Sequence, residues 1–502
     1  MSDPLMPSPD LFERLFNKGE TQLLWERIPG DLETPVSAYL KLCGTEPYCF
    51  LLESVEGGET LGRYSIIGFA PDTIWTCKDG KAALNGKPVS QLPLESLRDT
   101  IKSCHIDNKG PDDLPPMAVS GLFGYMGYDM VRLVEKLPDS NPDDLGIPDS
   151  VLIRPSLLVI FDNIKNTISL IAPVYEHADN SAVEPQEAYN AAQKRIKDAV
   201  MRLEKRIAPA LLHHESCLST PLSVESNMTR EQYHDAVEKA VEYIRAGEIF
   251  QVVPGQRFST AFDLPSFELY RALRRLNPSP FMFHLSFEGF SIVGSSPEIL
   301  VRVREDIVTI RPIAGTRKRG ATPEEDKALE EELLADPKER AEHLMLLDLG
   351  RNDVGRVCTY GSVKVTDSFM VERYSHVMHI VSNVEGRLRE DLDMIDALFA
   401  GFPAGTVSGA PKVRAMEIID ELETSRRSYY AGCAGYISGN GELDTCIALR
   451  TALVKDGKLY VQAGGGVVAD SDPEFEYQET INKSRALIRA AEMAIERSNR
   501  RT

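Results

Sequence analysis

Short apolar runs separated by turn dipeptides recur near both ends of this chain. Asp79-Gly80 and Asn85-Gly86 lie between such runs in the first hundred residues, and Asn440-Gly441 and Asp456-Gly457 lie between later ones. Asp-Gly and Asn-Gly favour β-hairpins, because the tight turns of hairpins need residues that tolerate a positive φ. The sequence therefore predicts antiparallel sheet in both halves of the chain. Further strands are predicted over 118–128, 150–171, 362–369, 376–384, 432–437, 446–455 and 458–462.

Helices alternate in blocks with these strands. Thr322 precedes Pro323, and Glu325 completes a pattern that is typical of a helix N-terminus with a capping box. Blocks of strands with segregated helices predict an α+β fold rather than a parallel βαβ sheet. The predicted helices span 184–207, 322–336, 338–358 and 471–497.

The chain length allows more than one domain. A length of 502 residues suits two to three domains or one large interlocked body. The segment 208–227 is rich in Pro, Ser and His and has no periodicity, so it is the best candidate for a linker. We therefore predict a β-rich N-terminal domain over 1–180, a helix and linker over 181–228, and a C-terminal domain over 229–502.

Charge and composition exclude several classes of function. Lys and Arg number 56 against 76 Asp and Glu, so the net charge of −20 would repel nucleic acid and anionic membranes. No run approaches the roughly 18 apolar residues that span a membrane, and the first ten residues lack the order of a secretory signal. With 42% hydrophobic and 26% charged residues, the composition is typical of a soluble globular enzyme. We expect a cytoplasmic protein.

Cysteine and histidine give no strong motif. The 8 cysteines are scattered, without a C-x-x-C pair or zinc-like spacing, so we expect reduced and mostly buried thiols. Cys433 lies between small residues as in a nucleophile elbow, but the leading glycine is missing and a strand is predicted there, which favours a buried structural role. His379 lies in an otherwise apolar predicted strand, where a histidine is more often a satisfied core residue.

Two predicted helices carry acids in pairs. Glu339 and Glu342 are three residues apart on one helix, and Glu476, Glu479 and Lys483 share one face of the last helix. Acids at this spacing usually belong to a solvated face. On spacing alone, the functional alternative is a Mg²⁺-dependent hydrolase that uses the paired carboxylates.

Three consecutive glycines strengthen the functional interpretation of these acids. Gly464 to Gly466 lie between a predicted strand and the last helix, where a backbone without Cβ atoms allows a ligand to approach and presents N–H groups to an anion. Mg²⁺ accepts a few carboxylates with water and substrate oxygens. The pattern therefore indicates a metal that bridges to an anionic ligand; a mere flexible turn is the alternative.

Several longer motifs run along most of the chain. They are LLES (51–54), GEIFQVVPGQRF from Gly247, NPSPFMFHL from Asn277, GSSPE from Gly294, IRPIAGTRKRG from Ile310, KERAEHLMLLDLGRNDVGR from Lys338, YSHVMHIVSNVEG from Tyr374, FPAGTVSGAPKVRAMEII from Phe402 and AGGGVVADSDPEFEYQET, which ends at Thr480. Together these motifs resemble those of the chorismate-utilising enzymes and, within them, the large subunits of anthranilate synthase. The resemblance implies large antiparallel sheets packed as a sandwich with helices on the outside.

The resemblance implies a reaction and a set of site residues. In this family ammonia adds at ring C2 of chorismate with loss of the C4 hydroxyl, and elimination of pyruvate leaves 2-aminobenzoate, the first committed step of tryptophan biosynthesis. Mg²⁺ would hold the ring carboxylate. The resemblance implies that Glu342, Glu479 and Glu476 bind or approach the metal. It also implies that Glu339 protonates the hydroxyl, that His379 moves a proton near C2, and that Thr406 assists catalysis. Arg450 would hold the enolpyruvyl carboxylate, and the substrate site would be completed by Gly315, Thr316, Tyr430, Gly464, Gly465, Gly466 and Lys483.

Two positions distinguish members of the family. Relatives that add water have lysine where Gln251 stands, and a glutamine cannot act as the base that activates water. Enzymes that aminate C4 typically have lysine where Ala314 stands. Both residues favour C2 amination. An aminodeoxychorismate or isochorismate synthase of the same fold, and a non-catalytic tryptophan-sensing relative, remain the alternatives.

The family also implies a partner and an inhibitor. Ammonia is supplied by a glutamine amidotransferase subunit, and too little of this chain is unassigned to contain a fused glutaminase. Tryptophan inhibits the family by binding in the N-terminal domain. The residues at the matching positions are Glu53, Ser54, Pro280, Phe281 and Met282.

Overall fold

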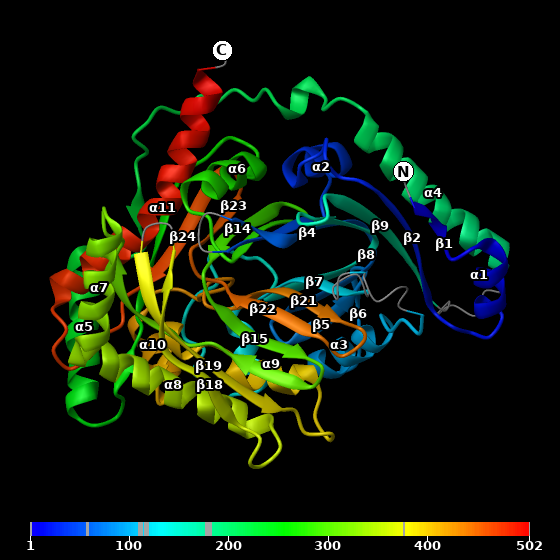
Figure 1. The fold of residues 1–502 in the computed structure, drawn as a ribbon. Helices are drawn as coiled ribbons and strands as arrows, with labels where there is room; N and C mark the ends of the chain where they lie inside the picture. The colour runs from blue at the N-terminus through cyan, green and yellow to red at the C-terminus, as the bar shows by residue number, and fades with distance from the viewer. Residues whose placement is uncertain are drawn as a thin grey trace.

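Antiparallel sheet forms the frame of the molecule, and helices cover its outer surfaces (Figure 1). The computed structural model describes residues 3–56, 60–108, 114, 120–175, 183–374 and 377–500. All named strands pair in the antiparallel sense, and two runs of strands diverge from the long pair β4 and β8. This arrangement confirms the α+β prediction.

The first run crosses from the N-terminal to the C-terminal half of the chain. Its central step joins Leu51 of β3 to His284 of β13, which are direct partners in the register. From one side of β4 the order is β4 (Thr60–Lys78), β3 (Cys49–Glu56), β13 (Phe281–Ser286), β14 (Phe290–Ser296), β23 (Thr451–Lys455), β24 (Lys458–Gly464), β12 (Gly255–Ala261) and β10 (Glu225–Ser226).

The second run begins at β8, the other partner of β4. Its order is β8 (Ser150–Asp162), β7 (Gly121–Met126), β21 (Cys433–Ser438), β22 (Leu443–Ile447), β15 (Ile299–Arg304), β16 (Ile307–Ile310) and β19 (Val377–Arg387), which also pairs with β17 (Ile313–Lys318) and β18 (Lys364–Arg373). The remaining strands are β9 (Thr167–Val174), β2 (Gln22–Pro29) and β1 (Asp3–Met6) beyond β8, β5 (Lys81–Leu84) and β6 (Lys87–Pro88) beyond β4, and the separate pair β11 (Gln251–Val252) and β20 (Gly409–Ala410).

The predicted hairpin turns are confirmed. Asp79-Gly80 joins β4 to β5, Asn85-Gly86 joins β5 to β6, and Asp456-Gly457 joins β23 to β24, with positive φ at both residues of each turn. Asn440-Gly441 joins β21 to β22, where Gly441 alone of the two has a positive φ. Local turn chemistry thus fixes the register of these strand pairs.

The helices also follow the predicted boundaries, with one correction. Thr322 accepts a hydrogen bond from the N–H of Glu325, but the Glu325 carboxylate accepts from the N–H of Ala321 instead of closing the capping box on Thr322. The helices are α1 (Pro9–Phe16), α2 (Pro35–Leu42), α3 (Pro93–Lys102), α4 (Pro185–Glu204), α5 (Arg230–Arg245), α6 (Ser266–Leu276), α7 (Pro323–Ala335), α8 (Pro337–Val357), α9 (Met394–Gly401), α10 (Lys412–Leu422) and α11 (Pro473–Asn499), with 3-10 turns η2 (Tyr128–Leu133), η3 (Pro209–Leu211) and η4 (Gly405–Val407).

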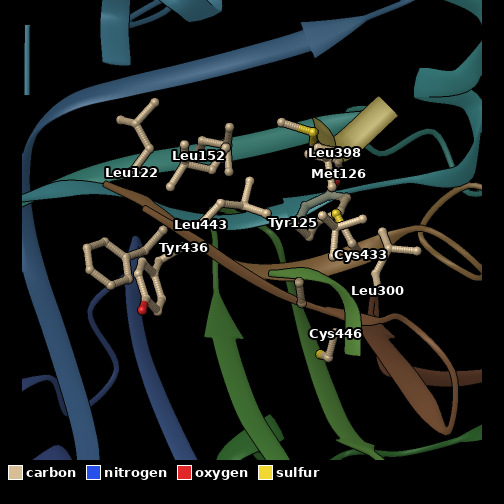
Figure 2. Close-up of a cluster of buried hydrophobic side chains, with 14 of the residues drawn as sticks. Leu122, Tyr125, Met126, Leu152, Leu300, Leu398, Cys433, Tyr436, Leu443 and Cys446 are labelled. Carbon is tan, nitrogen blue, oxygen red and sulfur yellow. The ribbon is translucent and has the colours of Figure 1, made fainter. Parts of the chain in front are cut away.

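The hydrophobic core has two main parts. One lies between the two runs of strands, and Figure 2 shows part of it, with Tyr125, Cys433 and Leu443 packed together. The other lies between the first run and the helices α2, α4, α6 and α11. All cysteines are free thiols, and each except the exposed Cys217 is buried. Cys433 is 2% exposed, and burial raises the pKa of its thiol to about 12, as expected for a structural cysteine.

Strands from both predicted domains pair directly, because β3 joins β13 and β7 joins β21. The division at 1–180 and 229–502 therefore stays a prediction. The first residues of two predicted strands, 118–119 and 376, lie outside the described residues. Within the described part of the chain, no helix is both long enough and apolar enough to cross a membrane.

Candidate functional site

A cavity of about 530 Å³ brings most of the predicted site residues together. Its walls come from β11, β17, β19 and β24, from η4, and from the helices α8 and α11. The predicted residues that line it are Gln251, Ala314, Gly315, Thr316, Glu339, Glu342, His379, Thr406, Tyr430, Arg450, Gly464, Gly466, Glu476, Glu479 and Lys483. Gly465 lies behind this surface, where a Cβ atom would stand 2.7 Å from Glu476 Oε2.

His379 is held in one orientation on β19. Its Nδ1 lies 3.0 Å from the carbonyl oxygen of Gly315 and 3.0 Å from Thr316 Oγ1. Because a carbonyl oxygen only accepts, Nδ1 carries the proton and Nε2 is left unprotonated. Burial, together with the positive charge of Arg450, lowers the pKa of His379 to about 4. His379 is therefore a neutral imidazole near pH 7 with an unprotonated Nε2.

Glu298 is a cavity residue that the sequence interpretation missed. It is 7% exposed, and its Oε1 accepts a hydrogen bond from Thr406 Oγ1 at 3.2 Å. Burial raises the pKa of Glu298 to about 8, although the Thr406 hydroxyl, the N–H of Ile313 and the charge of Arg450 act in the opposite direction. The carboxyl group is thus protonated near pH 7. The GSSPE motif contained this residue, but only the tertiary burial reveals its state.

Arg450 supplies a positive charge to the same cavity. No described residue forms an ion pair with its guanidinium, and burial lowers the pKa of Arg450 from its ordinary value. A buried guanidinium without a carboxylate partner is costly, so it is available for an anionic ligand. Glu298, which faces it, is held protonated and does not neutralise it.

Three carboxylates from the helices α8 and α11, those of Glu342, Glu476 and Glu479, also line the cavity. Burial raises the pKa of Glu342, and the charges of Glu339 and Glu479 raise it further. Burial and the neighbouring Glu479 raise the pKa of Glu476 to about 7. Glu476 Oε1 accepts from Ser471 Oγ at 2.8 Å, whereas its buried Oε2 has no hydrogen-bond partner. Such mutual repulsion and an orphaned oxygen fit a site for a divalent cation.

The protein alone does not enclose a metal beside these carboxylates. Among the residues that the structure describes, no three His, Cys, Asp or Glu side chains are grouped closely enough to hold an ion by themselves. Mg²⁺ commonly takes only one or two carboxylates and completes its shell with water and substrate oxygens. One or two of the carboxylates of Glu342, Glu479 and Glu476 would serve in that mode of binding.

Two cations balance these acids. Lys483 Nζ lies 2.9 Å from a Glu479 carboxylate oxygen and donates to the carbonyl oxygen of Gly464 at 2.8 Å. Arg317 donates to Glu339 at 2.9 Å, so Glu339 is engaged in an ion pair at the edge of the cavity. The predicted role of Glu339 as the proton donor stays a prediction.

The two residues that are predicted to distinguish family members, Gln251 and Ala314, both line the cavity. Gln251 is 4% exposed; its Nε2 lies 3.4 Å from Glu342 Oε1, and its Oε1 has no hydrogen-bond partner. A side chain at Gly466 would push against Gln251, because a Cβ atom would stand 2.8 Å from Nε2. Ala314 is buried on β17 and brings no basic group to the cavity.

A second and larger cavity, of about 870 Å³, lies on the other side of a shared wall formed by Pro297 and Ile313. It is lined by all five residues of the predicted tryptophan site: Glu53, Ser54, Pro280, Phe281 and Met282. The Glu53 carboxylate is fully buried and accepts from Arg274 at 2.7 Å and 3.0 Å, and from the Tyr270 hydroxyl. Glu53 is therefore fixed in position by its partners from α6.

Comparisons with known proteins identify the family to which this chain belongs. A family model described as chorismate binding enzyme matches residues 47–489, which include both cavities. The chain belongs to the chorismate-binding enzyme family. The anthranilate synthase component 1 of Cereibacter sphaeroides is 56% identical over 498 residues, covering 97% of this chain and 98% of that protein.

Solved structures agree with the family assignment. Anthranilate synthase component I from Streptococcus pneumoniae TIGR4 has a TM-score of 0.77 and 39% identity, covering 92% of this chain and 98% of that chain. The menaquinone-specific isochorismate synthase from Escherichia coli has a TM-score of 0.70 at 22% identity, covering 96% of this chain and 98% of that chain. The similarity to the isochorismate synthase is a similarity of fold alone. Both solved structures confirm the predicted fold.

Proposed function

We propose that this chain is the large component of a Mg²⁺-dependent anthranilate synthase, which converts chorismate and ammonia to anthranilate and pyruvate. The observation that carries the proposal is the combination, in one cavity, of the unpaired cation of Arg450 with the protonated carboxyl group of Glu298. Chorismate is a dianion with a hydroxyl leaving group, so it needs both. The names of the similar proteins support the same reaction.

The hydroxyl leaves with a proton from this chain. As the C4–O bond breaks, its electron pair stays on oxygen, and a proton from Glu298 converts the poor leaving group hydroxide to water. We assign this step to Glu298 in preference to Glu339, because Arg317 holds Glu339 in an ion pair. Arg450 offers a planar fork of donors to a substrate carboxylate.

The second stage needs a base. Loss of the C2 proton and cleavage of the C3–O bond restore the aromatic ring, and the departing enolpyruvate takes up a proton at its methylene carbon to become pyruvate. Nε2 of His379 is an unprotonated ring nitrogen in this cavity, and Thr316 and the Gly315 carbonyl fix the ring through Nδ1. We propose that His379 accepts the C2 proton.

The metal proposal rests on the three carboxylates from α8 and α11. One or two of those of Glu342, Glu479 and Glu476 would hold Mg²⁺, which would withdraw electron density from the ring carboxylate when bound. Lys483 offsets part of the negative charge of these acids through its ion pair with Glu479. Ser471 orients the Glu476 carboxylate through a hydrogen bond.

The nucleophile is proposed to be ammonia from a glutamine amidotransferase subunit. Gln251 has an unpaired carbonyl oxygen in the cavity, which can accept a hydrogen bond from ammonia but cannot take a proton from water. The relatives are named as component 1, which supports a second component. Addition of that subunit should make glutamine an effective nitrogen donor.

We propose the larger cavity as the site of feedback inhibition by tryptophan. Its lining combines the apolar side chain of Phe281 with the polar Ser54 and several charged side chains, as an amphiphilic amino acid requires. It shares Pro297 and Ile313 with the catalytic cavity, so a ligand in one can act on the wall of the other.

One assay tests the reaction. Purified protein is mixed with chorismate, Mg²⁺ and an ammonium salt at about pH 8.5, and the fluorescence of 2-aminobenzoate is followed together with pyruvate. Both products are expected in equal amounts. Pyruvate without the fluorescent product would indicate salicylate formation, an amino-substituted product without pyruvate would indicate C4 amination, and neither product would indicate a silent relative. Each of these three results contradicts the proposal.

A further inference from the structure

A buried arginine lies behind the catalytic cavity and outside its lining. Arg427 is 2% exposed and forms an ion pair with Glu423 at 2.5 Å, with further hydrogen bonds from Nε at 3.0 Å and 3.1 Å. Glu423 ends α10, four residues earlier in the chain. A pair this deeply buried is costly to desolvate and is weak evidence for a stabilising role by itself. Its remaining hydrogen bonds suggest a different role.

The rest of the guanidinium is directed at the backbone of cavity walls. Nη1 donates to the carbonyl oxygen of Val407 at 2.6 Å, and Nη2 donates to the carbonyl oxygen of Val253 at 2.6 Å. Both valines line the catalytic cavity. Val407 follows Thr406, the hydrogen-bond donor to Glu298, and Val253 lies two residues beyond Gln251.

Arg427 also touches a third wall. Its guanidinium carbon lies 5.5 Å from the centre of the Tyr430 ring, which lines the cavity, and 5.0 Å from that of Tyr128. Glu423 extends the network, because it accepts from the N–H of Gly255 at 2.8 Å. One planar group therefore joins η4, the segment between β11 and β12, and the Tyr430 turn.

We propose that Arg427 is a positioning residue for the reaction: by clamping the carbonyl of Val407 it holds Thr406 against Glu298, the proton donor. The inference rests on the proposed function of Glu298. Lysine cannot replace the arginine, because an ammonium is a point charge whose three donors do not lie in one plane with the spacing of the guanidinium fork. Small displacements of catalytic groups lower rates steeply.

The primary test compares Arg427→Lys with Arg426→Lys. Arg426, the neighbour on the same turn, pairs with Asp79 and Asp139 and donates to no cavity wall. We expect Arg427→Lys to keep a folded protein by circular dichroism while kcat falls about 100-fold and KM for chorismate changes far less. Arg426→Lys should keep the kcat of the parent. If the folded Arg427→Lys protein had the same kcat as the parent, the inference would be wrong.

A double-variant cycle separates positioning from general stability. Thr406→Val removes the hydroxyl through which Arg427 is proposed to act, so Arg427→Lys should cost little further kcat in that background. Both single variants should also move the alkaline limb of the pH–rate profile upward, because loss of the Thr406 hydrogen bond raises the pKa of Glu298. Additive losses of kcat and an unmoved limb would show a structural role only.

A second variant covers the case in which Arg427→Lys does not fold. Glu423→Gln keeps the acceptor oxygen for Gly255 and leaves Arg427 intact but less firmly held. It should lower kcat in the same direction by a smaller factor, with the same upward shift of the limb. Unchanged kcat in a folded Glu423→Gln protein would contradict the inference. If the parent itself made no anthranilate, the proposed function would fail instead.

Discussion

The hydroxyl of Thr406 donates a hydrogen bond to Oε1 of Glu298 in the wall of the catalytic cavity, with an oxygen–oxygen distance of 3.2 Å. The two residues are 108 positions apart in the sequence: Thr406 lies in η4, and Glu298 lies between β14 and β15. The hydrogen bond orients a carboxyl group whose pKa is raised to about 8 by burial. It therefore fixes the direction of the proton that Glu298 can donate.

Glu298→Gln should abolish the proton donor without removing a side chain. The amide can still accept from Thr406, so we expect the variant to fold. Because general acids contribute about 10²- to 10⁴-fold to rate, kcat for anthranilate should fall by that factor, with little change in KM for chorismate. Glu390→Gln, at an exposed acid, is the matched control. A fall in kcat of less than about tenfold would remove Glu298 from this role.

The pH–rate profile should have an alkaline limb near pH 8. Glu298 donates only when protonated, so activity should be retained below its pKa of about 8 and lost as the pH rises through that value. Free ammonia also rises with pH, so the ammonium salt must be adjusted to keep its concentration constant. The limb should disappear in Glu298→Gln. A limb of unchanged position in that variant would assign it to another group.

Arg450→Gln should weaken the binding of chorismate. The guanidinium has no ion-pair partner among the described residues, so its loss removes a charge-assisted contact that only the substrate makes. Such contacts are worth about 1.5–3 kcal/mol, or about 10- to 150-fold in KM. Steady-state kinetics with chorismate measures the change. Arg302→Lys, in the larger cavity, should leave KM for chorismate unaltered.

Glu479→Gln should weaken the binding of Mg²⁺, and turnover should fall with it. The carboxylate that lines the cavity with Glu342 and Glu476 becomes a neutral amide, which is a poorer ligand for a hard cation. Isothermal titration with Mg²⁺ in the presence of chorismate measures the binding directly, independently of activity. Glu474→Gln removes an acid in the first turn of the same helix that pairs with Arg230, and it should bind Mg²⁺ like the parent. Equal affinity in both variants would rule out a ligand role for Glu479.

Ser54→Phe should relieve inhibition by tryptophan while catalysis continues. Ser54 lines the larger cavity and not the catalytic one, so a bulky ring fills the proposed effector site and leaves Glu298 and Arg450 in place. We expect kcat without tryptophan within about twofold of the parent, and the affinity for tryptophan, measured by calorimetry, should fall at least about tenfold. Persistent inhibition at the parent's tryptophan concentration would show that the effector binds elsewhere.

The elements were predictable because their signals are local. The turn Asp456-Gly457 carries its own preference for positive φ, and Thr322 caps its helix through a group three residues away. The positions of His379 and Arg450 in the site came from family motifs rather than from periodicity, which favoured a core residue at 379. Sequence periodicity alone does not distinguish a buried histidine from a cavity histidine.

The sequence by itself determined the strands, the helices and the membership of the chorismate-binding family, because turn preferences, caps and motifs are carried by neighbouring residues. Only the tertiary structure decided the chemistry of Glu298 and the contacts of Arg427. The protonation of a buried carboxyl group such as that of Glu298 depends on how far the fold shields it from water. The hydrogen bonds of the Arg427 guanidinium depend on which distant backbone carbonyls the fold places beside it. Both quantities arise from residues far apart in the chain.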